Sequence, residues 1–457
     1  MTDRLKLVLI GAGSTVFTQR LVADVILSGE ADRWEIALVD IDPVTLDAVD
    51  RLVRKMLAFK GVSFPIVSTT NRREVLAGAN FVVTTIAVGG RRGWELDVQV
   101  PRKYKIFQPV GDSVMPGGIS RAMRMIPQMV AIAQDIAELC MDAYFLNYSN
   151  PMTAICRAVR VATGVPVIGL CHGVHYVEGV LAKFLGKEDG SITSFGVGLN
   201  HLTFLTKILC DGKDATPLLK AKLDEQRDLV QQEVRDKKDW PNVVTGRPSR
   251  YSDDPFAWSI FDRYGVFPVA IDRHITEFFP ERFPQGRYYG RTLGVDAFPI
   301  DDRIAIGDAW FAEMLAVARS TDPLPVSYFD NVPGESEQLV DIMKSLHFDQ
   351  RHVYSVNMPN QCAVPGLPAD AILEMPAAAG GAGFMALHSE ALPPALTAKL
   401  LAKIAAIELT VEAALSGNFD LFVEALLTDG SVSDPDQASA LACDLIEAHK
   451  IHLPQFA

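Results

Sequence analysis

Three short motifs place side chains that can bind a metal ion directly after apolar runs typical of β-strands. They are NYSNPM (147–152), GLCHG (169–173) and GLNHL (198–202). Because strand ends of a parallel sheet open on one crevice, we expect Asn150, Cys171 and His201 to converge there. A thiolate and an imidazole bind divalent transition metals and leave positions open for a substrate. The motifs therefore favour an open metal site.

The same residues also have ordinary structural interpretations, which the sequence alone leaves open. A lone cysteine such as Cys171 is often a small buried residue, and a lone histidine such as His201 is often a satisfied core residue. Asn150 stands before Pro151 and could simply cap the helix that follows. No C-x-x-C pair is present to indicate a structural zinc site.

A second group of ionisable residues lies in FPVAIDRHITEFFP (267–280), between apolar neighbours. It contains Asp272, Arg273, His274 and Glu277. His274 and Glu277 are three residues apart and could share one helix face. Ionisable groups in apolar surroundings indicate tuned acid–base chemistry. The alternative is a solvated helix start with an internal salt bridge.

A glycine-rich turn, Gly11-Ala12-Gly13-Ser14, follows the apolar run LKLVLI (5–10). Such a turn brings backbone N–H groups close to a pyrophosphate at a helix N-terminus, although Val16 stands where the dinucleotide motif has its third glycine. The run EIALVD (35–40) ends in Asp40, with Asp42 just beyond, and an acid there can accept a ribose hydroxyl. These features predict NAD rather than NADP.

A second turn, Ala87 to Arg91, follows another expected strand. Its Gly89 could let the backbone approach the same cofactor. An ordinary loop is the competing interpretation.

The elements that must position these residues alternate through the first 190 residues. This order predicts an α/β fold with a Rossmann-type doubly wound parallel sheet, which we assign to an NAD-binding domain over 1–190. The expected strands are 5–10, 35–40, 81–88, 143–148 and 166–171, and the expected helices are 16–28, 43–59, 120–139 and 151–163.

From residue 191 strand-like and helix-like runs no longer alternate regularly. Residues 191–457 are expected to form a mixed α+β lobe that binds the substrate and the metal and makes the contacts between subunits. Two strand-like runs at 191–198 and 202–209 indicate an antiparallel pair with Asn200 and His201 between them. Loops are expected at 241–255 and at AAAGGAGF (377–384), and helices at 216–238, 301–319, 335–346, 394–415 and 434–449.

The composition excludes several classes of protein. Of 457 residues 49% are hydrophobic, which allows a large core, and the net charge of −13 disfavours nucleic acid and anionic lipid as partners. No apolar run reaches the length of a membrane span, and the N-terminus does not resemble a signal peptide, so we expect a cytoplasmic protein. The six scattered cysteines are expected to be thiols. An apolar second lobe of this size suggests a homodimer or homotetramer.

Taken in order, the motifs resemble those of glycoside hydrolase family 4. The matching segments are LIGAGSTVFT (9–18), LVDID (38–42), PGGISRAMRMIP (116–127), NYSNPM, GLCHG and GLNHL. The resemblance implies a fold like that of lactate and malate dehydrogenases, with bound NAD⁺ and usually Mn²⁺. On this resemblance Cys171 and His201 are metal ligands, and Asn150 and Asn200 hold the substrate.

The resemblance also implies a mechanism that differs from hydrolysis by two carboxylates. The sugar is oxidised transiently at C3, a base removes the C2 proton, and the aglycone is eliminated with the help of the metal. Asp272 is the first candidate for the base and His274 the second. His172 could assist departure of the aglycone.

The choice of sugar remains open among several branches of this family. His172 after the cysteine resembles the α-galactosidase, α-glucosidase and α-uronidase branches, and IDRHITEFFP is similar to the uronidase type. α-Galacturonides are the first expectation, then α-glucuronides and neutral α-galactosides or α-glucosides. Arg273, Arg91 or Arg121 could pair with a substrate carboxylate. The alternatives from other classes are an NAD-dependent 2-hydroxy acid dehydrogenase and an NAD-sensing regulatory protein.

Overall fold

The computed structural model describes residues 4–14, 17–225, 254–331 and 338–457. Six parallel strands form its first half in the order β3-β2-β1-β4-β5-β6. This is the strand order of the dinucleotide-binding fold, so the Rossmann-type prediction is confirmed. The strands are β1 (Leu5–Ile10), β2 (Trp34–Val39), β3 (Ile66–Thr69), β4 (Phe81–Thr84), β5 (Tyr144–Asn147) and β6 (Val167–Gly169).

Helices alternate with these strands and cover the sheet, because strands buried on both faces need apolar cover. Val8 and Val82, in neighbouring strands, are fully buried. The helices are α1 (Thr18–Leu27), α2 (Pro43–Lys60), α3 (Gly90–Lys103), α4 (Met115–Leu139), α5 (Met152–Thr163) and α6 (Gly173–Leu185). Helix α4 begins five residues before the predicted start, with Pro116 in its first turn.

The sheet does not end at the predicted boundary near residue 190. β6 pairs with an antiparallel strand from the second half, at Gly169 and Asn357, and the full order continues β13-β14-β7-β8-β10. These strands are β7 (Ile192–Leu199), β8 (Leu202–Cys210), β10 (Phe267–Pro268), β13 (His352–Pro359) and β14 (Ile372–Gly380), with β9 (Lys213–Asp214) and β15 (Gly383–Ala386) at the side. Among the described residues the two halves therefore share one sheet of 13 strands, while their division into domains stays a prediction.

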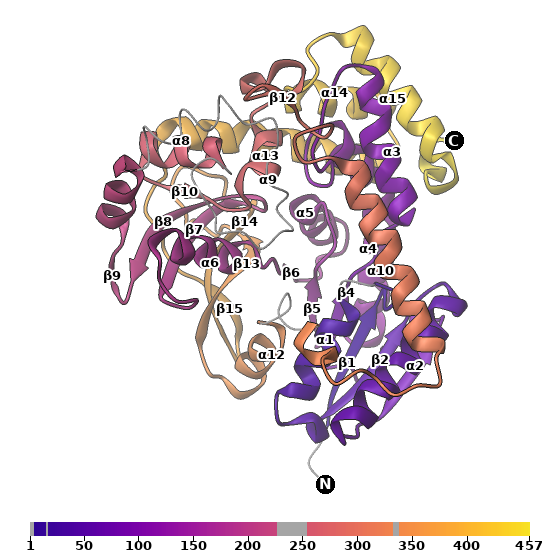
Figure 1. Cartoon of the computed structure of the whole chain (residues 1–457). Coiled ribbons are helices and arrows are strands. Elements are labelled where there is room, and N and C mark those ends of the chain that lie inside the picture. Colours follow the sequence, from indigo (N-terminus) through magenta and orange to yellow (C-terminus); the bar gives the residue numbers. More distant parts are fainter. Residues whose placement is uncertain (1–3, 15–16, 226–253, 332–337) are drawn as a thin grey trace.

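The helices of the second half pack back onto the first. Figure 1 shows α15 beside α3 near the C-terminus and α10 running along one flank down to α2. They are α8 (Pro255–Tyr264), α9 (Ile271–Phe278), α10 (Ile300–Arg319), α11 (Tyr328–Asn331), α12 (Leu339–Phe348), α13 (Pro394–Ser416), α14 (Phe419–Asp429) and α15 (Pro435–His449). Short elements complete the fold: strands β11 (Arg287–Tyr288) and β12 (Arg291–Thr292), and 3-10 turns η1 (Ala31–Arg33), η2 (Arg72–Glu74), η4 (Pro280–Arg282), η5 (Pro284–Gly286), η6 (Lys450–His452) and η7 (Pro454–Phe456).

One prediction about the second half is wrong. Residues 377–384 are not a loop, because 377–380 complete β14 and 383–384 begin β15, which pairs with it. Ala377 and Ala379 are fully buried in the sheet, where small side chains fit between neighbouring layers. The predicted antiparallel pair β7–β8 is confirmed. The loop predicted at 241–255 and the end of the helix predicted at 216–238 fall largely outside the described residues.

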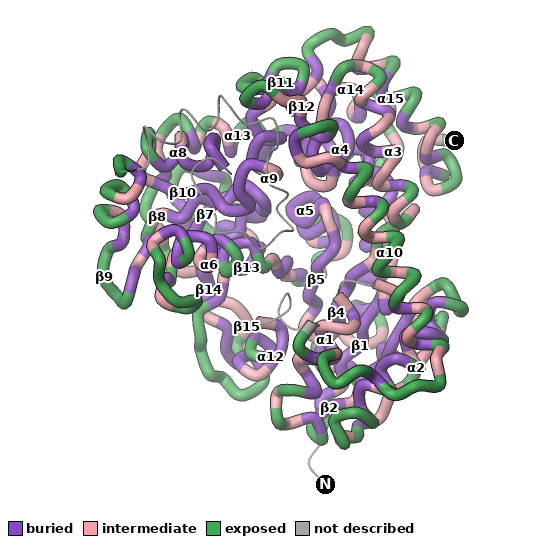
Figure 2. The backbone as a smooth tube through the Cα atoms, in the orientation of Figure 1, coloured by how far each residue is buried: buried purple, intermediate pink, exposed green. Residues whose placement is uncertain are grey.

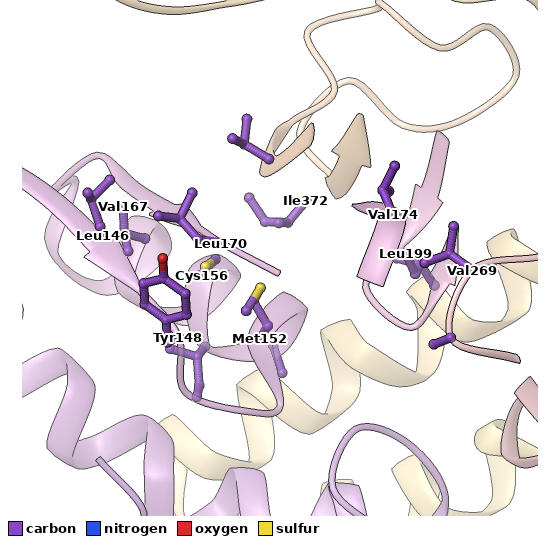
Figure 3. Packing of buried hydrophobic residues seen from close by; sticks show 14 of the residues in the cluster. Leu146, Tyr148, Met152, Cys156, Val167, Leu170, Val174, Leu199, Val269 and Ile372 are labelled. Carbon is purple, nitrogen blue, oxygen red and sulfur yellow. The ribbon is translucent and has the colours of Figure 1, made fainter. Parts of the chain in front are cut away.

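A continuous apolar core runs through both halves. Figure 2 shows the strands of both halves largely buried and the outer side of α10 exposed. Close up, Leu146, Val167 and Leu170 of the parallel part gather on one side, and Val174, Leu199 and Val269 on the other (Figure 3). The strand ends that carry the predicted site are thus embedded in packed apolar side chains. Within the described ranges, no helix is both long enough and apolar enough to cross a bilayer.

Candidate active site

A tight turn between β7 and β8 presents Asn200 and His201. Leu199 pairs with Leu202, so only these two residues form the hairpin turn. His201 has φ +66°, a left-handed backbone conformation that a residue other than glycine adopts at a cost of about 1 kcal/mol or more. The paired strands on both sides hold the imidazole in this conformation.

Three side chains from distant parts of the chain meet at this turn. Asp112, His201 and His274 each offer one ligand atom, and these atoms all lie within 4.8 Å of one another. The two imidazole centroids are 4.3 Å apart. Ser113 Oγ lies 2.7 Å from Asp112 Oδ1 and 2.8 Å from His201 Nδ1, and so joins the two groups. A carboxylate and two imidazoles at this spacing suit a divalent transition metal.

The charges of this cluster support the same conclusion. Burial alone would raise the pKa of Asp112, but its interactions with His201, His274 and Arg121 lower that pKa far below the ordinary range. Burial likewise opposes protonation of His201, yet Asp112 and Cys171 raise the pKa of His201 well above 6.5. Cys171 is therefore close enough to His201 to act on it. Because a metal ion replaces the imidazole proton, negative groups that attract the proton also attract the metal.

The pKa of His274 shifts in the opposite direction from that of His201. Burial and the nearby His201 lower the pKa of His274 well below its ordinary value, so its ring is uncharged at neutral pH. A neutral imidazole can bind a metal or accept a proton.

Two asparagines next to this cluster each have a buried, unpaired side-chain oxygen atom. Asn150 Nδ2 donates to Asp112 Oδ2 (3.2 Å), and Asn200 Nδ2 donates to Glu374 Oε2 (3.3 Å). Oδ1 of each asparagine is buried and finds no hydrogen-bond partner among the described residues. Since a buried acceptor without a partner is costly, a metal ion or a sugar hydroxyl fits these positions. Glu374 is fully buried, and burial raises its pKa.

The chemistry of this donor set therefore fits a divalent metal. It joins two imidazoles and a carboxylate, with the Cys171 thiol interacting with His201 and the Asn150 amide bonded to Asp112.

Asp272 lies in different surroundings from its neighbour His274. It is fully buried, accepts hydrogen bonds from Phe256 N (2.9 Å) and Ala257 N (2.7 Å), and accepts a third from the Tyr288 hydroxyl (2.6 Å). Burial raises the pKa of Asp272 to about 7. These contacts are those of a carboxylate that anchors the first turn of α8. The catalytic role of Asp272 stays a prediction.

Arg273 is a half-buried cation with an unused donor. Its Nε has no hydrogen-bond partner within the described part of the chain. Burial, followed by the charge of Arg303, lowers the pKa of Arg273 to about 10, while Asp112 and Glu277 act in the opposite direction. Arg273 therefore lies between a second arginine and the carboxylates of Asp112 and Glu277, where an anionic group could pair with it.

Glu277, one turn after His274, holds the loop that carries Asp112. Its Oε1 accepts hydrogen bonds from the backbone N–H groups of Val110 and Gly111, both at 2.8 Å. Burial raises the pKa of Glu277 to about 8. Helix α9 thus carries His274 of the cluster and, through Glu277, fixes the loop that carries Asp112.

The structure places the other predicted substrate and acid residues as follows. His172 is the exposed N-cap residue of α6, and its charge reaches His274. Arg121 is half-buried and donates to Asn150 O (3.0 Å). Arg91 instead pairs with Asp308 of α10 (2.6 Å) and lies over the Phe311 ring. The contacts of Arg91 are therefore with α10 and not with the cluster.

The glycine turn of the predicted dinucleotide site lies at the carboxyl end of β1. Gly13 N donates to Asp40 Oδ2 (2.7 Å), and a Cβ on Gly13 would lie 2.8 Å from that oxygen. A Cβ on Gly11 would meet the backbone of Ile86 at 2.8 Å, so neither position admits a side chain without rearrangement. Ser14 N donates to Gly11 O, and Ser14 Oγ accepts from Phe17 N. The close turn fits the approach of a pyrophosphate.

Hydrogen bonds connect this turn to the metal-binding cluster. Thr85 Oγ1 donates to Gly11 O (2.9 Å), and Ser149 Oγ donates to Ile86 O (2.8 Å). Asn150 follows Ser149 and donates to Asp112. The predicted cofactor and metal residues therefore lie along one edge of the sheet.

The sequence did not indicate three of these residues. Asp112 lies in PVGDS, which has no periodicity, and Glu374 lies inside an apolar strand. Arg303 is an ordinary helix residue by sequence. Only the charge of Glu374 within an otherwise apolar run could have singled it out, since a buried carboxylate needs partners.

Both halves of the chain match models of one protein family. Residues 6–187 match the family 4 glycosyl hydrolase model, and residues 196–432 match the family 4 glycosyl hydrolase C-terminal domain. The chain belongs to glycosyl hydrolase family 4. This assignment confirms the resemblance and leaves the 2-hydroxy acid dehydrogenase and the regulatory protein without support.

Related proteins carry the names of several glycosidases. The chain is 29% identical to an α-glucosidase of Erwinia rhapontici over 450 residues, which are 93% of each protein. It is 31% identical to an α-galacturonidase of Thermoanaerobacterium saccharolyticum over 395 residues, 83% of this chain and 81% of that protein. A 6-phospho-α-glucosidase from gut microorganisms, solved in complex with NAD and Mn²⁺, has a TM-score of 0.80 at 17% identity, covering 99% of this chain and 100% of that one.

Proposed function

We propose that this protein is an α-glycosidase that hydrolyses α-uronides, α-galacturonides first, with NAD⁺ and a divalent metal such as Mn²⁺. The observation that carries the choice of substrate is the half-buried Arg273, whose buried Nε is unpaired among the described residues and which lies near Arg303 and Asp112. A neutral sugar would offer this cation no carboxylate at its unpaired Nε–H, and a buried donor without a partner is costly. A uronate carboxylate would pair with it through the planar guanidinium.

The bound groups supply redox and Lewis-acid chemistry: NAD⁺ takes and returns a hydride, and the metal ion polarises neighbouring sugar oxygens. Cys171 and His201 hold the metal in this proposal, as the motifs predict, and Asp112 joins them. The free Oδ1 atoms of Asn150 and Asn200 orient the sugar hydroxyls.

The proton acceptor in this proposal is His274. The His274 ring is uncharged and belongs to the cluster, whereas the Asp272 carboxylate accepts its hydrogen bonds from α8 and Tyr288. A ring nitrogen of His274 would take the C2 proton. Asp272 is the alternative, and exposed His172 would assist the leaving group.

The proposed function is tested by comparing two substrates on two variants. We expect the enzyme with NAD⁺ and Mn²⁺ to hydrolyse 4-nitrophenyl α-galacturonide with a higher kcat/KM than 4-nitrophenyl α-galactoside. Arg273→Gln should lower kcat/KM on the uronide by about 30-fold or more, since hydrogen bonds between charged groups are worth about 1.5–3 kcal/mol each. Its effect on the neutral galactoside should be small. Arg91→Gln is the matched control, because the Arg91 guanidinium pairs with Asp308 and lies over the Phe311 ring, both on α10.

A wild-type enzyme that prefers the neutral galactoside would contradict the uronide assignment. An equal loss on both sugars in Arg273→Gln would show that Arg273 does not recognise the carboxylate.

A further inference from the structure

The C-terminal turn η6 lies against the loop that follows β4. His452 Nε2 lies 3.4 Å, and Arg124 Nε 3.5 Å, from the position that a Cβ on Gly89 would take. Gly89 has φ +81° and is the N-cap of α3. These two side chains therefore close one side of the Val88–Gly89 loop. His452 lies beyond residue 432, where the match to the family's C-terminal domain ends.

Arg124, on α4, fixes the loop by its backbone. The guanidinium is almost completely buried; Nε donates to Val88 O (2.9 Å), and Nη1 and Nη2 donate to the two oxygens of Asp97 (2.8 and 2.5 Å). A bidentate pair with a buried carboxylate allows the planar group little rotation. The carbonyl of Val88 is thus held by a side chain that is itself held in one orientation.

Asp97, on α3, extends this network to the C-terminal helix. Besides Arg124, it accepts from Ser120 Oγ (3.0 Å), and His449 Nε2 of α15 lies 3.0 Å from its Oδ1. Asp97 and His449 are both buried. Helices α3, α4 and α15 therefore meet at one carboxylate directly beneath the loop.

Two residues that precede this loop in the same segment, Thr85 and Ile86, contact the glycine turn. Thr85 Oγ1 donates to Gly11 O, and the backbone of Ile86 packs where a Cβ on Gly11 would be. Any shift of the Val88–Gly89 loop would therefore change the opening of the dinucleotide site.

We propose that Asp97, Arg124, His449 and His452 form a brace that holds the Val88–Gly89 loop in the conformation that binds NAD⁺. The four residues act through the loop's backbone and are positioning residues. The brace makes the C-terminal turn part of the cofactor site. This inference rests on the NAD⁺ assignment of the proposed function and is independent of the choice of sugar.

The test is the NAD⁺ dissociation constant of His452→Ala, measured by isothermal titration calorimetry on the full chain without substrate. His452 is only partly buried, so its removal should leave the fold intact. If loosening the loop leaves about a tenth of the molecules in the binding conformation, the apparent dissociation constant rises about tenfold. The kcat at saturating NAD⁺ and the affinity for Mn²⁺ should stay within about twofold of wild type.

The matched control is Ile451→Ala, one residue away and 81% exposed, which should bind NAD⁺ as the wild type does. A second variant, His449→Gln, should also weaken NAD⁺ binding, with circular dichroism to verify its fold. Unchanged NAD⁺ affinity in His452→Ala, or an equal loss in Ile451→Ala, would overturn the brace. Failure of the wild type to bind NAD⁺ would instead overturn the proposed function.

Discussion

Replacing Glu277 by glutamine should stabilise the metal-free protein at alkaline pH. Both hydrogen bonds to the loop end on the same oxygen, Oε1, so a glutamine carbonyl can keep the bonds from Val110 and Gly111. What Glu277→Gln removes is the buried negative charge. The carboxylate is 2% exposed, and burial raises its pKa from 4.5 to about 8.

The sign and size of this effect follow from proton linkage. Because the folded-state pKa is raised, the stability linked to Glu277 is fully present below pH 4.5 and is lost as the pH rises to about 8. The difference between 4.5 and about 8 corresponds to about 5 kcal/mol, since each pKa unit is worth about 1.36 kcal/mol. For a chain of 457 residues with an unfolding entropy of about 2.1 cal/mol/K per residue, this equals about 5 °C in Tm.

The assay is thermal unfolding of wild type and Glu277→Gln at pH 5 and pH 9, with a chelator present to keep metal from the site. The two proteins should unfold at about the same temperature at pH 5, and the variant should unfold a few degrees higher at pH 9. Comparing the two removes the contribution of every other titrating group. Glu281→Gln, at a half-exposed glutamate four residues on, is the matched control and should show no such difference. A variant that is equal to or less stable than wild type at pH 9 would refute the reasoning.

Two further predictions concern the cluster itself. Cys171→Ser should weaken Mn²⁺ binding by about tenfold or more, because a serine hydroxyl is a poorer ligand than a thiolate for this class of metal. Competition with a chelator measures the Mn²⁺ affinity, and an unchanged affinity would remove Cys171 from the ligand set. His274→Gln should lower kcat by about 100-fold or more, and Asp272→Asn by less than about tenfold, since a general base contributes about 10²–10⁴ to the rate. Steady-state kinetics of the two folded variants compare the losses, and a larger loss in Asp272→Asn would make Asp272 the base.

The strand-end motifs could be predicted from sequence because the geometry of a parallel sheet limits where they lead. Cys171 follows β6 and Asn150 follows β5, and adjacent parallel strands end at the same edge. His201 is predictable for a local reason as well, since two residues between two apolar runs indicate a hairpin turn. The glycine turn could be predicted for a local reason of the same kind, because its residues follow one another directly after an apolar run.

Asp112 could not be predicted in this way, because distant residues determine its position. The loop that carries it is held at Val110 and Gly111 by Glu277 and at Met115 N by Asp429 Oδ1, more than 160 residues away in each case. Asp429 is in turn paired with the buried Lys403. Similarly, the alanines of β14 have weak strand propensity, and their pairing with β13 on one side and β15 on the other makes them a strand.

Helix α4 connects these two sets of interactions, which gives the segment PGGISRAMRMIP a physical role. Its N-terminus follows Asp112 and Ser113, and Arg121 and Arg124 are three residues apart and therefore neighbours on one face. Arg121 donates to the carbonyl of Asn150 beside the metal-binding cluster, and Arg124 donates to the carbonyl of Val88 beside the glycine turn. Since an α-helix has a fixed rise of about 1.5 Å per residue, α4 sets the distance between the two loops. In our proposal, transient oxidation needs the sugar carbon and the nicotinamide at a fixed distance from each other, and one rigid helix sets that distance.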